Sequence, residues 1–114
     1  MKLETRETGA DLTYLSLHGR LDLEGTEAIE LKFSLSATTS SHPVIVDVSE
    51  VSFLASLGMR MLVTAAKALR SKGLAMVLVA PNEVVRDALE VTGLSQLLLV
   101  ADDETTALTL VQRA

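Results

Sequence analysis

Hydrophobic and polar residues along this chain alternate between the spacing of strands and the spacing of helices. Residues 2–7 alternate weakly and residues 12–17 more clearly, and the TGAD segment between them, residues 8–11, is typical of a turn. This pattern predicts a β-hairpin. Short apolar runs predict a strand covered on at least one face over residues 44–48, a second buried strand over residues 74–80, and a last strand over residues 97–100.

Two long segments have helical spacing. The first, residues 24–37, places Ala28, Leu31 and Leu35 on one side, and Asp22 precedes it as a candidate N-cap. The second, residues 59–70, is predicted to end at Gly73 and to turn its apolar residues toward the core: Met59, Leu62, Val63, Ala66 and Leu69.

Two shorter helices are predicted in the C-terminal part of the chain. Asn82 follows Pro81 and is a good N-cap for a helix that ends near Gly93. The apolar stripe of this helix consists of Val84, Val85, Ala88 and Leu89. Either Asp102 or Asp103 is expected to cap the last helix, whose apolar residues are Ala107, Leu108 and Val111.

The elements follow the order β-β-α-β-α-β-α-β-α, and strands separated by helices should pair in parallel through right-handed crossovers. The sequence therefore predicts an α/β fold with a mixed sheet of about five strands packed with about four helices. Since no linker, repeat or low-complexity tract interrupts its 114 residues, we expect a single domain.

Charge and composition exclude several classes of function. Ten basic and fifteen acidic residues give a net charge of −5, the wrong sign for gripping nucleic acid directly. The absence of cysteine removes disulfides and thiolate chemistry. The N-terminal segment lacks a secretory apolar region, and no apolar run approaches the roughly 20 residues of a membrane span. We expect a cytoplasmic protein without membrane insertion, present as a monomer or weak dimer.

Catalytic and cofactor motifs are nearly absent, and no cofactor is predicted. Ser56 does not lie in a hydrolase elbow, because Leu54 stands where that turn requires glycine. His18 and His42 belong to no metal-ligand or nucleophile–base pattern. One group of carboxylates would converge at an edge of the sheet, as a divalent-ion site or as solvated loop and capping residues: Asp22, Glu24, Asp47 and Glu50.

Ser56 is the leading functional candidate, because it lies between a strand and an amphipathic helix that begins near Gly58. A hydroxyl at such a junction is exposed, and the helix start offers unpaired N–H groups and the positive end of its dipole. A phosphate would be favoured there. Ser56 is also well suited to be the N-cap of the helix, and the two roles do not exclude each other.

Nearly the whole chain resembles the STAS domain of bacterial anti-sigma factor antagonists. The resemblance rests on the order and spacing of several segments rather than on any one of them. These are HGRLD at residues 18–22, VIVDVSEVSF at 44–53, the serine loop with Gly58, KGLAMVLVAPNEVVRDALEVTGL at 72–94, and DDETTAL at 102–108.

The resemblance implies a regulatory module without enzymatic activity. In this family, the unphosphorylated antagonist binds an anti-sigma factor, often a serine kinase, and so frees a sigma factor. Phosphorylation of the loop serine by that kinase breaks the complex, and a phosphatase restores it. The family serine corresponds to Ser56, and the loop at Asp22 is expected beside it as part of the partner surface.

The residues around Ser56 complete the predicted partner surface. Phosphorylated family members commonly carry Asp before the serine and Ser or Thr after it, whereas this chain has Ala55 and Leu57. Leu57 is expected either to tuck into the core or to contact the partner. A stripe at helical spacing from Ser56 is either a solvated helix face or a binding edge that, with Leu57 and Gly58, contacts the partner: Arg60, Thr64, Lys67 and Ser71.

Two other functions remain open. One is an accessory STAS subunit of an ABC-type lipid or solute transporter, which docks on the ATPase and needs no phosphorylation. The weaker one is an enzyme or nucleotide-binding protein that uses the edge formed by Asp22, Asp47 and Ser56.

Overall fold

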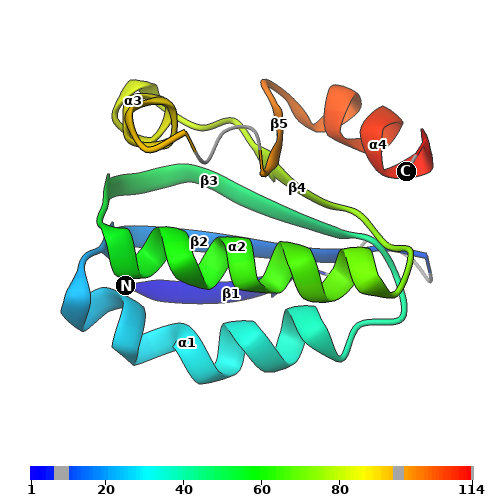
Figure 1. Ribbon diagram of the computed structural model, residues 1–114, viewed down its shortest axis with the longest axis horizontal. Coiled ribbons are helices and arrows are strands. Elements are labelled where there is room, and N and C mark those ends of the chain that lie inside the picture. Colours follow the sequence, from blue (N-terminus) through cyan, green and yellow to red (C-terminus); the bar gives the residue numbers. More distant parts are fainter. Residues whose placement is uncertain (7–10, 94–96, 114) are drawn as a thin grey trace.

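The computed structural model describes residues 1–6, 11–93 and 97–113 and has the predicted order of elements (Figure 1). The strands are β1 Lys2–Arg6, β2 Thr13–Leu21, β3 Val44–Leu54, β4 Met76–Val79 and β5 Leu99–Ala101. The helices are α1 Leu23–Thr38, α2 Ser56–Ser71, α3 Glu83–Val91 and α4 Glu104–Arg113.

The strands form one mixed sheet in the order β1-β2-β3-β4-β5. β1 pairs antiparallel with β2, which confirms the hairpin, and β2 to β5 are parallel to one another. Most of the turn predicted between β1 and β2 lies outside the described residues. The α/β class and the mixed sheet are therefore as predicted.

Alternate residues of β2, β3 and β4 supply two separate cores, because successive side chains point to opposite faces of a sheet. Leu15 and Leu17 of β2 belong to the larger core, which α1, α2 and α3 cover. Tyr14 of β2 and Ile45 of β3 belong to the smaller core, to which α4 contributes Ala107 and Val111. Helices α1 and α2 pack against each other (Figure 1).

Helix α1 does not bury the apolar side that its spacing indicates. Ala28, Leu31 and Leu35 are exposed. The buried face consists instead of Gly25, Thr26, Ile29, Phe33 and Ala37. Apolar residues lie on both sides of this helix, and the large Phe33 and Ile29, flanked by small residues, fit closely against the sheet.

The other elements differ from the predictions mainly at their ends. β3 continues through Leu54, beyond the predicted residues 44–48, and β5 begins later than predicted, at Leu99. The apolar stripe predicted for α2 is buried throughout, and Gly73 follows the helix with a φ of +77°, as its capping role requires. In α3, Val84 is 51% exposed, so only part of that predicted stripe reaches the core.

The predicted caps of the shorter helices are largely confirmed. Asn82 accepts a hydrogen bond from the N–H of Val85 at 3.1 Å. Of the two candidates before α4, Asp103 is the one that binds the first turn, through the N–H of Thr106 at 2.7 Å. Among the described residues, no helix combines the length and apolar character needed to cross a membrane.

Candidate functional site

Strands β2 and β3 end side by side, and this arrangement fixes the start of α2. Leu21 and Leu54 are register partners, and the N–H of Ala55 donates to the carbonyl oxygen of Leu21 at 2.9 Å. Ala55 keeps an extended backbone, with φ −93° and ψ 170°, and its carbonyl accepts from Met59 at 3.0 Å. The helix therefore turns away from the sheet immediately after Ala55.

Ser56 is the first residue of α2 and is exposed, so its predicted alternative role as N-cap is wrong. The cap position belongs to Ala55, which has no side-chain acceptor, because the helix already begins at Ser56, earlier than an N-cap serine requires. Within the described chain, no hydrogen bond engages the Ser56 hydroxyl. The N–H groups of the first turn are likewise left without a side-chain cap.

Gly58 allows the first turn of α2 to approach the end of β2 closely. A Cβ atom at this position would lie 3.0 Å from the Cβ of Leu21 and 3.1 Å from its carbonyl oxygen. Gly58 is buried. It therefore positions Ser56 instead of offering a surface of its own.

Asp22 lies directly after β2 and caps α1, as predicted. One carboxylate oxygen accepts from the N–H of Gly25 at 2.8 Å, and the other lies 3.3 Å from Nε of Arg20. The Gly25 N–H, followed by the Arg20 guanidinium, holds the pKa of Asp22 below its usual range. The edge beside Ser56 thus carries an ionised carboxylate paired with the guanidinium of Arg20.

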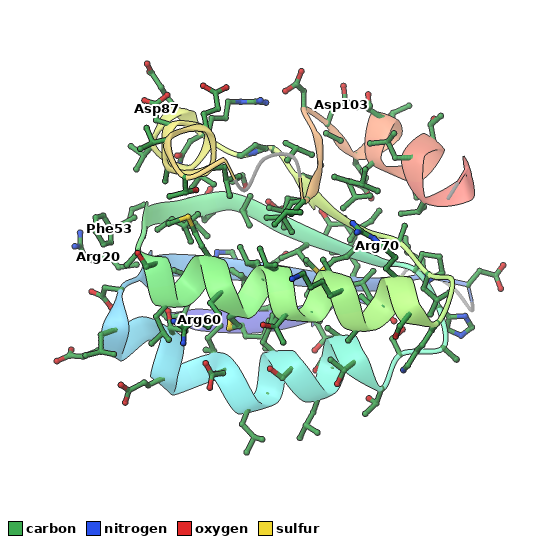
Figure 2. The ribbon with its side chains drawn as sticks, viewed as in Figure 1. Arg20, Phe53, Arg60, Arg70, Asp87 and Asp103 are labelled. Atoms are coloured by element: carbon green, nitrogen blue, oxygen red, sulfur yellow. The ribbon has the colours of Figure 1, made fainter. Side chains whose placement is uncertain are left out.

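Arg20 and Phe53 form a contact at this edge that the sequence pattern missed. The Arg20 guanidinium lies over the Phe53 ring, 4.5 Å from its centroid, and Figure 2 shows both residues beside the start of α2. Phe53 is 38% exposed and lies only a short distance along the chain from Ser56. Arg20 and Phe53 are register partners on β2 and β3. This pairing could have predicted the contact, but it is known only once the two strands are aligned.

The remaining predicted contact residues line a groove between α1 and α2. Leu57, Arg60 and Thr64 face Glu30 and Ser34 of α1 across this groove. Leu57 is half-buried, so it packs partly against the protein and keeps part of its surface open. The whole stripe from Ser56 along α2 is exposed: Arg60, Thr64, Lys67 and Ser71.

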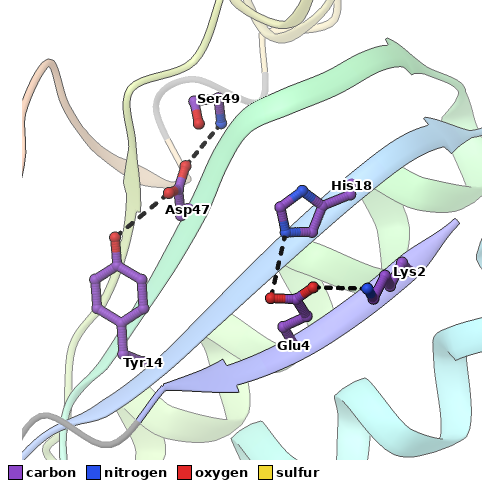
Figure 3. A network of polar contacts seen from close by, with 6 residues as sticks. All are labelled: Lys2, Glu4, Tyr14, His18, Asp47 and Ser49. Carbon is purple, nitrogen blue, oxygen red and sulfur yellow. Dashed lines mark hydrogen bonds and ion pairs between the residues drawn. The ribbon is translucent and has the colours of Figure 1, made fainter.

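The carboxylates predicted at one edge are separated in the structure. Asp47 accepts from the hydroxyl of Tyr14 at 3.5 Å and from the N–H of Ser49 at 2.9 Å (Figure 3). Asp22 is engaged elsewhere, by Gly25 and Arg20. Among the described residues, no group of three His, Asp or Glu side chains is placed to hold a metal ion. The divalent-ion alternative therefore has no support there.

His18 lies in a polar patch on β1 and β2. Its Nε2 is 4.0 Å from one carboxylate oxygen of Glu4. The other oxygen of Glu4 lies 3.0 Å from Nζ of Lys2 (Figure 3). These contacts are those of a polar sheet surface. Nε2 of His18 accepts or donates no hydrogen bond to a described residue, so the geometry offers no nucleophile–base pair at this nitrogen.

The comparison with protein families identifies this arrangement. The sequence matches the STAS domain over residues 2–107. The chain belongs to the STAS-domain family. The strand-to-helix turn at Ser56 lies within the matched residues. The comparison with curated proteins gives no match.

Solved structures of bacterial proteins are similar to this STAS domain. A putative anti-sigma factor antagonist from Thermotoga maritima is 21% identical, with 96% of this chain and 94% of that chain covered and a TM-score of 0.86. An anti-sigma factor antagonist from Mycobacterium paratuberculosis is 24% identical, with coverages of 97% and 95% and a TM-score of 0.83. Unphosphorylated SpoIIAA, also an anti-sigma factor antagonist, is 20% identical, with coverages of 99% and 98% and a TM-score of 0.78. Bacillus SpoIIAA has also been solved in a phosphorylated form.

The same fold occurs in a protein of another class. The murine anion transporter Slc26a9 is 19% identical over a match that covers 95% of this chain and 19% of the transporter, with a TM-score of 0.79. At these identities, the likeness establishes the fold of the STAS domain and leaves its partner to be argued from the site.

Proposed function

We propose that this STAS domain is an anti-sigma factor antagonist of the cytoplasm. In this proposal it binds an anti-sigma factor of the serine kinase type through the surface around Ser56, and so frees a sigma factor. Phosphorylation of Ser56 by the kinase breaks the complex, and a phosphatase restores it. The family match and the antagonists among its structural neighbours support this function.

The observation that carries the proposal is the free hydroxyl of Ser56 at the uncapped start of α2. A kinase requires an exposed hydroxyl, and a structural N-cap would have occupied it with a backbone N–H. The first-turn N–H groups and the positive end of the helix dipole would then stabilise the added phosphate. Arg60 lies one turn along the helix and is exposed, so it is available as a cationic partner.

The size of the electrostatic effects indicates that phosphorylation acts on association and not on folding. At a helix N-terminus, a phosphate of charge about −1.5 to −2 is mildly stabilising, by about 0.3–1 kcal/mol. Against a partner surface that fits an uncharged serine, the same charge costs several kcal/mol through desolvation and repulsion, or a loss of about a hundredfold or more in affinity.

The other predicted residues have distinct roles in this surface. Leu57, Arg60 and Thr64 supply a mixed apolar and polar contact area beside Ser56. Asp22 contributes a charge and holds the neighbouring start of α1. Gly58 acts by letting α2 sit against Leu21. Direct regulation through binding, without catalysis, fits a site in which no described side chain hydrogen-bonds to the Ser56 hydroxyl as a base would.

The accessory transporter subunit remains the alternative, and the STAS fold of an anion transporter gives it some support. It predicts a different partner and no dependence on the charge at Ser56. The nature of the captured partner therefore separates the two functions.

The test is to capture partners of the tagged full chain in its own cells, identify them by mass spectrometry, and purify the one captured. The proposal expects a serine kinase, which transfers phosphate from ATP to the wild-type chain and not to Ser56→Ala. The affinity of Ser56→Asp for this kinase should fall about a hundredfold or more, because of the added charge. Ser41→Asp is the matched control, since Ser41 is exposed and lies before β3, at the opposite end of that strand from Ser56.

A captured ATPase or permease in place of a kinase would establish the transporter alternative. A kinase that binds Ser56→Asp as tightly as wild type would contradict the switch. Intact-mass spectrometry of the protein from its own cells provides an independent readout, since a phosphorylated fraction that maps to another residue would also contradict it.

A further inference from the structure

The outward face of α1 carries an apolar stripe that the fold of a single chain leaves uncovered. Leu31 is 73% and Leu35 is 53% exposed, and Ala28 is exposed one turn earlier. Their spacing of three and four residues places them on one line along the helix. The side of α1 that packs on the sheet is the opposite one, which includes Ile29 and Phe33.

This spacing is that of the seam between two helices in a coiled coil. Ala28, Leu31 and Leu35 take successive a, d and a positions, where apolar side chains insert between those of a partner helix. Isolated exposed leucines need no explanation, but a line of them along one helix indicates a contact surface. The groove between α1 and α2 involves other residues of α1, so the stripe is free of intramolecular packing.

The charges that flank the stripe identify the helix that fits it. Glu27 lies on one flank, at a g position, and Lys32 lies on the other, at an e position. In parallel two-stranded coiled coils, a g residue pairs with the e residue five places further along the partner helix. Both side chains are exposed, and neither forms an ion pair with any other residue that the structure describes.

We infer that the occupant of this surface is a second copy of the chain, with the two α1 helices parallel about a two-fold axis. Glu27 of each copy then pairs with Lys32 of the other, and the apolar stripes meet between them. A purely basic partner helix would satisfy Glu27 and leave Lys32 opposed by a like charge. A second copy of the chain carries the same two charges at the same spacing and therefore satisfies both flanks at once.

The neighbouring residues limit the dimer to a weak one. Glu24 occupies the preceding d position, where the two copies would bring like charges together, and Thr38 occupies the following one, where they would bring polar groups together. The apolar contact is therefore short and ends at these two residues. The dimer should therefore form as the protein concentration rises and dissociate on dilution. It uses the outer side of α1 and leaves Ser56, at the start of α2, exposed in both copies.

Sedimentation equilibrium of the full chain, up to millimolar concentration, tests this inference without any other protein. We expect reversible dimerisation that Leu31→Asp weakens by about tenfold or more in Kd. Val84→Asp is the matched control, since Val84 is a similarly exposed aliphatic residue on α3, and it should leave the Kd unchanged. Circular dichroism checks that each variant is folded.

A charge exchange distinguishes the parallel pair from other contacts. Glu27→Lys and Lys32→Glu should each weaken the dimer by about threefold or more, and the double exchange should restore it. Residues five apart do not face each other within one helix, so the restoration requires a second copy. A chain that stays monomeric over the whole range, a dimer indifferent to Leu31→Asp, or no restoration by the double exchange would each overturn the inference.

Discussion

The guanidinium carbon of Arg20 lies 4.5 Å from the centroid of the Phe53 ring, and the two residues are register partners on neighbouring parallel strands. Arg20 also contacts Asp22, whose carboxylate caps α1. A single side chain thus connects the ends of β2 and β3 with the start of α1. These contacts hold the edge of the sheet from which Ser56 projects.

The stack of Arg20 on Phe53 should contribute measurably to stability. A double-mutant cycle with Arg20→Ala and Phe53→Ala, measured by urea unfolding, is expected to give a coupling free energy of about 0.5–1 kcal/mol, as for an exposed cation–π pair. Arg70→Ala is the control, because Figure 2 shows Arg70 on the part of α2 away from Phe53. Its effect should add to that of Phe53→Ala, and equal coupling for both arginines would contradict the stack.

Gly25→Ala should destabilise the fold, although alanine normally stabilises a helix relative to glycine. A Cβ atom at residue 25 would lie 1.9 Å from the carbonyl oxygen of Arg20, a backbone atom that cannot easily move. We expect a loss of about 1–3 kcal/mol in the free energy of unfolding. Gly58→Ala should cost less, since its closest contact would be 3.0 Å. A stabilised Gly25→Ala variant would show that the start of α1 does not approach Arg20 this closely.

The Asp22 cap should make stability depend on pH. The Gly25 N–H and Arg20 lower the pKa of Asp22 in the folded state relative to the unfolded state. The contribution of the Asp22 carboxylate to the stability of the fold is therefore fully present above the ordinary aspartate pKa. It is lost as the pH falls through the lowered pKa of the folded state. Asp22→Asn keeps a capping acceptor but does not titrate. It should show a smaller loss of stability between about pH 7 and about pH 3 than wild type, measured by urea unfolding.

Asp103 and Glu4 also have lowered pKa values and add to the same acid dependence. Asp103→Asn is therefore the control that removes the titrating carboxylate of another helix cap, far from Ser56, and keeps a capping acceptor. Its effect should add to that of Asp22→Asn. An unchanged pH dependence in the Asp22→Asn variant would contradict the charged cap.

Most of the fold could be predicted from the sequence because local signals agreed with tertiary packing. Asn82 after Pro81 predicts the start of α3, and Gly73, with its φ of +77°, marks the end of α2. In α1, local signals were insufficient. Apolar residues lie on both of its sides, so periodicity predicted a helix but could not tell which side is buried. Phe33 faces the sheet, and Leu31 is exposed.

The strand-to-helix junction of the candidate site was predicted in its position but not in its details. The junction at Ser56 follows from a strand run and a helix run that meet there. Whether serine is the N-cap or the first helical residue depends on where β3 stops, and that is fixed by the hydrogen bond from Ala55 to Leu21. The contact of Arg20 with Phe53 depends on the pairing register of β2 and β3, which shifts along these strands. That register cannot be predicted from the sequence pattern of either strand.

Asn82 should stabilise the fold through both ends of its side-chain amide. The oxygen accepts from the N–H of Val85, and the nitrogen donates to the carbonyl of Val51 at 2.7 Å, which ties α3 to β3. Asn82→Ala loses both bonds and should cost about 1–3 kcal/mol in urea unfolding. Asn82→Asp keeps the cap but places a carboxylate against the Val51 carbonyl. A fully stable Asn82→Asp variant would show that the bond to Val51 contributes nothing.

Adding negative charge to α2 should affect stability with opposite signs at its two ends. Ser56 and Ser71 are the first and last residues of this helix, and both are exposed. Ser56→Asp places the charge at the positive end of the dipole and should raise the free energy of unfolding by about 0.3–1 kcal/mol. Ser71→Asp places it at the negative end and should lower the free energy of unfolding by a similar amount of about 0.3–1 kcal/mol.

Thermal and urea unfolding at low ionic strength would measure both effects, and added salt should reduce them, because exposed charges are screened. Thr64→Asp, in the middle of the same exposed stripe, should have almost no dipole effect and provides the baseline. If Ser56→Asp instead unfolded the domain, a phosphate on Ser56 would act by destroying the fold. Loss of partner binding would then no longer demonstrate a switch that works at the interface.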